Sequence, residues 1–217
     1  MTEEQQLQAI KDFSYQKMKK DTSGHNFDHI QRVVKTAKRL LNEEPANKLI
    51  TLAAAYLHDV ADDKLVSDPK ELDLEIQKFL QTLGLTSDQI EKILFITRNL
   101  SFSKSLENRQ KLSLEGQIVQ DADRLDAIGA IGITRAIYYG GKHAETIYDP
   151  DILPRKNLNK AEYRNLSNET IINHFYEKLL KLTDMMNTPT AKKIAQARHQ
   201  YMIDFLKEFK NEWNAER

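Results

Sequence analysis

Apolar residues recur at helical spacing along most of the chain. One face of a predicted helix spans residues 30–41, and His29 lies at the N-terminal edge of that face. The run from Leu49 to Val60 is apolar almost all round, which is typical of a helix buried at the centre of a domain. No stretch shows the alternating pattern of a strand. We therefore expect an all-α fold.

Local signals predict where several helices begin and end. The segment Asp68-Pro69-Lys70-Glu71 has the cap, proline and glutamate of a helix start, and Gly84 would end that helix. Thr86 and Gln89 have the spacing of a capping box, which predicts a second helix directly afterwards. Thr188-Pro189 opens the last predicted helix.

The stretch 114–139 predicts one helix or two joined helices, with Gly129 and Gly132 allowing close approach of a neighbour. The helical pattern fades over about 140–167, which we expect to be a loop covering a site. It returns over about 168–215. With a core at about 20–140, residues 1–217 are expected to form a single-domain helical bundle of roughly eight to ten helices.

Composition narrows the class of protein. The net charge is zero, whereas nucleic-acid-binding domains are usually basic, so no nucleic-acid partner is expected. The chain has no cysteine, which excludes thiol catalysis and cysteine-type zinc sites and fits a reducing compartment. The N-terminal residues lack an apolar signal segment, and no apolar run is long enough to span a membrane. A cytoplasmic protein without a membrane partner is expected.

Four side chains suggest metal chemistry. His58 and Asp59 end the buried apolar run, and burying a carboxylate is costly unless a cation offsets its charge. His29 and Asp123 lie in similar apolar settings. Two imidazoles and two carboxylates suit Mn(II), Fe(II), Co(II) or Zn(II) better than Ca(II).

Each of these residues also has an ordinary structural interpretation. A histidine on an apolar face is more often a hydrogen-bonded core residue than a metal ligand. An aspartate near a helix end, such as Asp59, often caps the helix. Asp123 could instead form a buried ion pair with Arg124 or Arg135. Spacing alone leaves these alternatives open.

Three segments resemble the HD-domain metal-dependent phosphohydrolases, whose signature is His…His-Asp…Asp. They are Gly24–Val33, Leu57–Val60 and Asp121–Gly129. The resemblance spans most of the chain and implies an all-α fold of the HD type. It also implies one divalent ion, with manganese favoured over magnesium, iron, cobalt, nickel or zinc. The ligands implied are His29, His58, Asp59 and Asp123.

Asp121 and Asp126 are rivals for the last ligand position. Asp123 is favoured because residues 122–125 also resemble a segment of the bacterial guanosine-tetraphosphate hydrolases. That resemblance implies that Asp62 and Asp63 assist the attacking water. The chain departs from these enzymes at Ala127, where they have asparagine. It also departs from the HD-family motif at Asn26, where aspartate is expected. Asp63 could equally belong to a solvated turn.

A phosphate substrate requires cations. Lys64 follows the acidic pair closely and is the first candidate to offset charge in catalysis and to bind substrate. Further candidates lie near predicted helix ends or loops, although most basic residues must simply be solvated: His25, Arg98, Lys104, Arg124, Lys142 and His143. His25 could equally be a capping or surface histidine.

The expected function is metal-dependent hydrolysis of a nucleotide or other phosphate ester. The resemblance is greatest to a bacterial branch that includes a nucleoside triphosphate pyrophosphohydrolase, which implies conversion of a deoxynucleoside triphosphate to monophosphate and pyrophosphate. The alternatives are a nucleotidase, a cyclic-nucleotide or dinucleotide phosphodiesterase, and a non-catalytic binding module with a structural metal. The apolar final helix, which ends near Trp213, also suggests a homodimer.

Overall fold

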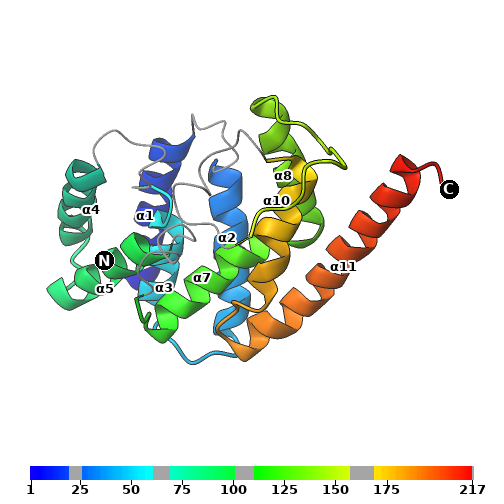
Figure 1. Cartoon of the computed structure of the whole chain (residues 1–217). Coiled ribbons are helices and arrows are strands. Elements are labelled where there is room, and N and C mark those ends of the chain that lie inside the picture. Colours follow the sequence, from blue (N-terminus) through cyan, green and yellow to red (C-terminus); the bar gives the residue numbers. More distant parts are fainter. Residues whose placement is uncertain (20–25, 61–68, 101–109, 157–168, 217) are drawn as a thin grey trace. The chain divides into compact units, whose positions relative to one another are not determined.

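Every element of regular secondary structure is a helix in the part of the chain that the computed structural model describes, residues 1–19, 26–60, 69–100, 110–156 and 169–216 (Figure 1). Those ranges contain nine α-helices and one 3-10 helix, and no strand. The all-α prediction is therefore confirmed. Within the same ranges, no helix has the length and apolar character needed to cross a membrane.

The helices form two compact units, residues 1–122 and 123–217. The first unit contains α1 (Glu3–Met18), α2 (Phe27–Leu41), α3 (Lys48–Leu57), α4 (Pro69–Thr82), α5 (Ser87–Asn99) and the start of α7 (Leu114–Asp126). The second contains the end of α7, α8 (Gly129–Lys142), α10 (Ile171–Glu177), the 3-10 helix η1 (Leu179–Thr183) and α11 (Pro189–Trp213).

Helix α3 is the core of the first unit. All of its residues from Leu49 to Leu57 are buried, as its apolar sequence predicts. It packs against α1, α2 and α5. Because an α-helix buried on all sides has no solvated face, its C-terminal end delivers the next residues, His58 and Asp59, directly into the protein interior.

Helix α2 is amphipathic and buries one face. Asn26 caps its N-terminus, and the Asn26 side chain accepts a hydrogen bond from the backbone N–H of His29. The buried face then continues along the helix through Ile30, Val33, Val34, Ala37 and Leu40. His29 is therefore held at the start of a face that points into the core.

The helix ends predicted from local signals are found in the structure. Helix α4 begins at Pro69, while its predicted cap, Asp68, lies outside the described residues. Gly84 follows the end of α4 with a positive φ of 81°. Thr86 and Gln89 form the capping box of α5. Thr188 caps α11, with Pro189 in its first turn.

The stretch 114–139 forms two joined helices, α7 and α8, which meet at Ala127 and Ile128. Gly129 has a φ of 75°, and a Cβ there would lie 2.9 Å from Cγ of Arg198 in α11. The predicted close approach of another helix therefore occurs at Gly129, whereas a Cβ at Gly132 would instead meet the carbonyl oxygen of Ala127. Helix α8 continues through Gly140 and Gly141 to Lys142, past the start of the predicted loop.

The apolar pattern after residue 170 divides between two elements. Helix α10 ends at Glu177 and the 3-10 helix η1 follows, although the spacing of the apolar residues is compatible with one longer helix. The residues of that pattern are nevertheless buried: Ile171, Ile172, Phe175, Leu179, Leu182 and Met186.

Candidate metal centre

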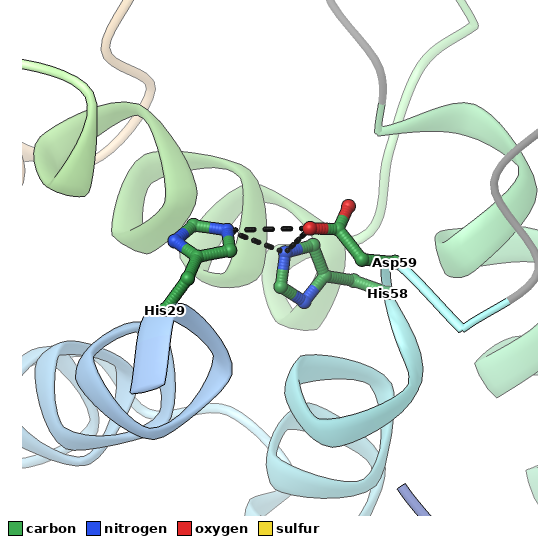
Figure 2. A group of neighbouring side chains, drawn as sticks. All are labelled: His29, His58 and Asp59. Carbon is green, nitrogen blue, oxygen red and sulfur yellow. Dashed lines mark hydrogen bonds and ion pairs between the residues drawn. The ribbon is translucent and has the colours of Figure 1, made fainter. Parts of the chain in front are cut away.

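His29 projects from the first turn of α2 and is only 1% exposed. A histidine so deeply buried requires polar partners for its ring nitrogens. Its Nε2 atom faces His58 and Asp59, which come from the end of α3 (Figure 2). Two helices therefore contribute to the same small polar cluster.

The ring of His58 is oriented by the helix that precedes it. His58 is the C-cap residue of α3, and its Nδ1 lies 2.9 Å from the carbonyl oxygen of Ala55. A carbonyl oxygen only accepts hydrogen bonds, so Nδ1 carries the proton of this contact. In the neutral ring, Nε2 then holds a lone pair, which points towards His29 and Asp59.

The three facing atoms form a nearly equilateral triangle (Figure 2). His29 Nε2 lies 3.3 Å from His58 Nε2 and 3.3 Å from Asp59 Oδ2, and His58 Nε2 lies 3.4 Å from the same oxygen. Ligands held about 2.1 Å from one ion at angles of roughly 90–110° are ~3.0–3.4 Å apart. The spacing of this triangle thus fits a single bound divalent ion.

The electrostatic surroundings of Asp59 also fit a cation. Within the described part of the chain, no hydrogen bond reaches its buried Oδ2, which faces the two imidazoles instead. Burial raises the pKa of the Asp59 carboxyl, but the positive charge of protonated His58 and His29 outweighs burial and holds this pKa well below its usual value. When both rings are neutral, as metal binding requires, a bound cation would supply the positive charge that the Asp59 carboxylate faces.

Among the described residues, this is the one group of three or more such side chains with the spacing of a metal site. It contains three of the four ligands expected from the sequence. The fourth, Asp123, is a half-buried residue of α7 in the second unit, and its role as a ligand stays a prediction. The same is true of the ligand roles of the other three.

The neighbours of Asp123 have structural partners of their own. Arg135 Nη1 donates a 2.8 Å hydrogen bond to Asp126, one of the rival aspartates. Arg124, which is also buried, donates to the carbonyl oxygen of Met185. The other rival, Asp121, is fully buried.

The remaining predicted site residues are more widely spread. Arg98 pairs with Asp73 of α4 through a 2.6 Å contact. Lys142 and His143 are exposed at the end of α8, where the His143 ring stacks on Tyr139 and its Nδ1 donates to the Tyr139 carbonyl oxygen. Their substrate-binding roles stay predictions. The other candidates lie outside the described residues: His25, Asp62, Asp63, Lys64 and Lys104.

Sequence reasoning did not identify the contribution of Ala55. Its carbonyl oxygen orients the His58 ring, and a backbone group has no signature of its own in a sequence. The relevant signal would have been a histidine directly after a buried helix, because the last turn of a helix has carbonyl oxygens without partners inside the helix.

Known proteins resemble the chain over nearly its whole length. The HD domain matches residues 26–128. The crystal structure of a Lactobacillus plantarum protein is 50% identical, with a TM-score of 0.87 and 98% of each chain covered. An HD-superfamily hydrolase from Bacillus thuringiensis is 40% identical, with a TM-score of 0.79, covering 99% of this chain and 100% of its own.

A third structure is that of Bacillus subtilis YpgQ in complex with ADP. It is 32% identical, with a TM-score of 0.76, and the match covers 95% of this chain and 97% of YpgQ. The chain belongs to the HD superfamily of hydrolases. It is a metal-dependent phosphohydrolase, and the cluster of His29, His58 and Asp59 is compatible with the divalent ion that this class uses.

Proposed function

We propose that this enzyme hydrolyses deoxynucleoside triphosphates to the monophosphate and pyrophosphate, using one divalent ion, with manganese favoured. The observation that carries the proposal is the triangle of His29 Nε2, His58 Nε2 and Asp59 Oδ2 with sides of 3.3–3.4 Å. The structure of YpgQ with ADP supports a nucleotide as the substrate.

The proposed ligands are His29, His58, Asp59 and Asp123. Four ligands leave coordination positions open, and a divalent ion at such a site supplies Lewis acidity towards phosphate and water. The protein's own contribution is orientation. The Ala55 carbonyl fixes the His58 ring, and the Asn26 cap fixes the turn that carries His29.

The remaining catalytic roles are proposed from the family resemblance. Asp62 and Asp63 would orient the attacking water and accept its proton. Lys64 would offset the negative charge that develops on the phosphate groups. His25, Arg98, Lys142 and His143 are proposed to hold the substrate.

A single-ion site favours this reaction over phosphodiester cleavage. HD phosphodiesterases often carry additional ligands for a second ion, whereas the described residues contain one cluster with the spacing of a metal site. The nucleotidase and phosphodiesterase alternatives therefore become outcomes of the activity test.

The test is an assay of purified protein with Mn(II) and each deoxynucleoside triphosphate. We expect monophosphate and pyrophosphate in equal amounts. Reaction in ¹⁸O-labelled water would then show which phosphorus is attacked, because attack at the α-phosphorus places the label in the monophosphate. Orthophosphate released from monophosphates would indicate a nucleotidase, and cleavage of cyclic or dinucleotides a phosphodiesterase. Absence of turnover with every phosphate ester would indicate a binding module.

The metal ligands are tested with His58→Ala. We expect this variant to lose both bound metal and turnover while its circular dichroism stays close to that of the wild type, because the change removes one ring at a helix end. His199→Ala is the matched control, since His199 contacts Thr183 in the second unit. Retention of metal and activity by His58→Ala would refute the ligand assignment.

A further inference from the structure

The buried face of α1 contains one polar residue where an apolar one is expected. Ile10, Ser14 and Met18 follow one another at spacings of four residues and therefore lie on one side of the helix. Ile10 and Ser14 are 0% exposed and Met18 is 3% exposed. A serine with no access to water requires a hydrogen-bond partner inside the protein.

Its partner is the backbone of α3. The Ser14 hydroxyl donates a 2.6 Å hydrogen bond to the carbonyl oxygen of Tyr56, which is 42 residues away in sequence. Tyr56 lies in the last turn of α3, two residues before His58 and three before Asp59. The serine therefore links α1 to the turn that carries two of the three clustered side chains.

The last turn of a helix has carbonyl oxygens without partners inside the helix. Here three of them are satisfied in different ways. Ala55 accepts from the His58 ring at 2.9 Å, and Leu57 accepts from the backbone N–H of Val60 at 3.1 Å. Tyr56 accepts from Ser14, a donor that belongs to another helix. A side chain that takes no part in the cluster itself thus ties this turn to α1.

We propose that Ser14 is a positioning residue for the metal centre, acting through the Tyr56 carbonyl on His58 and Asp59. The inference rests on the proposed function in so far as these two residues are metal ligands. Loss of the hydroxyl would leave the Tyr56 carbonyl unsatisfied in a dry environment, and the turn would relax to regain a donor. Metal sites tolerate ligand displacements of only about 0.5 Å, so a small relaxation lowers affinity.

The test is Ser14→Ala, which removes the hydroxyl and adds no bulk. Metal-free protein is titrated with Mn(II) by calorimetry, and the Kd is compared with that of the wild type. We expect the Kd to rise up to about 10-fold, the lower end of the effect of removing a group that hydrogen-bonds a metal ligand itself, because Ser14 acts on the backbone before the ligands. The visible absorption of bound Co(II), which reports coordination geometry, is expected to change as well.

Thr51→Val, a change within α3, is a matched control. Thr51 is also 0% exposed, and its hydroxyl donates a 2.7 Å hydrogen bond to the carbonyl oxygen of Asn47 at the opposite end of α3. Each variant therefore loses one buried hydroxyl group that donates a hydrogen bond to a backbone carbonyl oxygen at one end of α3. Only Ser14→Ala is expected to change the Mn(II) Kd and the Co(II) spectrum.

Two results would overturn the proposal: an Mn(II) Kd for Ser14→Ala within twofold of the wild type with an unchanged Co(II) spectrum, or equal weakening by Thr51→Val. All titrations are made at a temperature where circular dichroism shows every variant to be fully helical, so that a loss of stability is not mistaken for a loss of affinity. Normal Mn(II) binding by His58→Ala would instead refute the metal centre itself. Intact binding without nucleotide turnover would refute only the proposed substrate.

Discussion

Asp59 and Glu145 each bury a carboxylate oxygen, but their surroundings move their pKa values in opposite directions. Burial raises the pKa of both. At Asp59 the adjacent imidazoles outweigh burial, so its pKa falls well below the usual value. At Glu145 the negative charge of Glu169 adds to burial, although His174 and His143 partly oppose it, and the pKa is raised. The folded protein thus favours the charged form of Asp59 and disfavours the charged form of Glu145.

The raised pKa of Glu145 predicts a pH-dependent effect of Glu145→Gln on stability. Because the pKa of Glu145 is raised on folding, the folded protein binds more protons above the usual glutamate pKa, and its free energy of unfolding falls as pH rises through that window. Glutamine carries no charge and avoids this loss. Glu145→Gln should therefore stabilise the protein relative to the wild type more at pH 8 than at pH 5, as measured by urea unfolding.

The control for this prediction is Glu212→Gln, which neutralises an exposed glutamate of α11. Its effect on the urea midpoint should be small and similar at both pH values. An equal pH dependence in the two variants would show that net charge, and not the surroundings of Glu145, determines the result.

At the scale of elements, the helix boundaries depend on a few local devices. The Thr86 capping box, the Thr188 cap and the positive φ of Gly84 all act within a few residues of the helix end. The boundary between α7 and α8 is different. Gly129 combines a positive φ with close contact to the Arg198 side chain, whose guanidinium donates to the Leu125 carbonyl oxygen at the end of α7. A residue of α11 therefore helps to define this boundary.

Gly129→Ala and Gly84→Ala are predicted to differ in their effect on stability. Both place an alanine at positive φ, which costs roughly 1–2 kcal/mol. At Gly84 a Cβ would meet no atom within 4 Å, whereas at Gly129 it would lie 2.9 Å from Arg198 Cγ. In urea unfolding, Gly129→Ala should therefore lower the free energy of unfolding by about 1–3 kcal/mol more than Gly84→Ala does, as expected for overpacking. Equal losses would mean that the Arg198 side chain moves aside freely.

At the scale of the whole molecule, the candidate metal centre joins α2 to the end of α3 inside the first unit. An ion that binds only the folded protein stabilises it by mass action. The second unit has a different kind of polar centre, in which Arg155 contacts both Glu169 and Glu177 at 3.1 and 2.6 Å. An ion bound at the candidate metal centre is therefore expected to stabilise the folded protein.

Metal removal should consequently lower the melting temperature. Mn(II) at 100 times its Kd is expected to add about 2.7 kcal/mol, and each kcal/mol corresponds to roughly 2–4 °C in a protein of this size. Thermal melts followed by circular dichroism, with Mn(II) or with a chelator, test this directly. His58→Ala should melt at the same temperature in both conditions. Identical melts of the wild type would contradict a metal centre of this kind.

The homodimer suggested by the final helix stays a prediction. Trp213 is 51% exposed near the end of α11, where its ring packs against Phe209 and Tyr148. Phe205, Phe209 and Trp213 of this helix therefore contact one another in succession within the second unit.

The helical class, the buried character of α3 and the capped starts of α5 and α11 could be predicted from the sequence, because they depend on apolar spacing and on contacts between residues three or four positions apart. The sequence also singled out His29, His58 and Asp59 through a recognisable family pattern. The ligand role of Asp123 and the catalytic roles of Asp62 and Asp63 stay predictions from the same pattern.

The atoms that face one another are known only from the packing of the folded chain. That packing brought the two Nε2 atoms and Asp59 Oδ2 within 3.4 Å, paired Arg135 with Asp126, and placed the Ser14 hydroxyl on the Tyr56 carbonyl. It also divided the apolar pattern after residue 170 between α10 and η1. These features depend on the packing of segments far apart in the chain and on backbone groups that every residue possesses, so no local pattern of side chains can specify them.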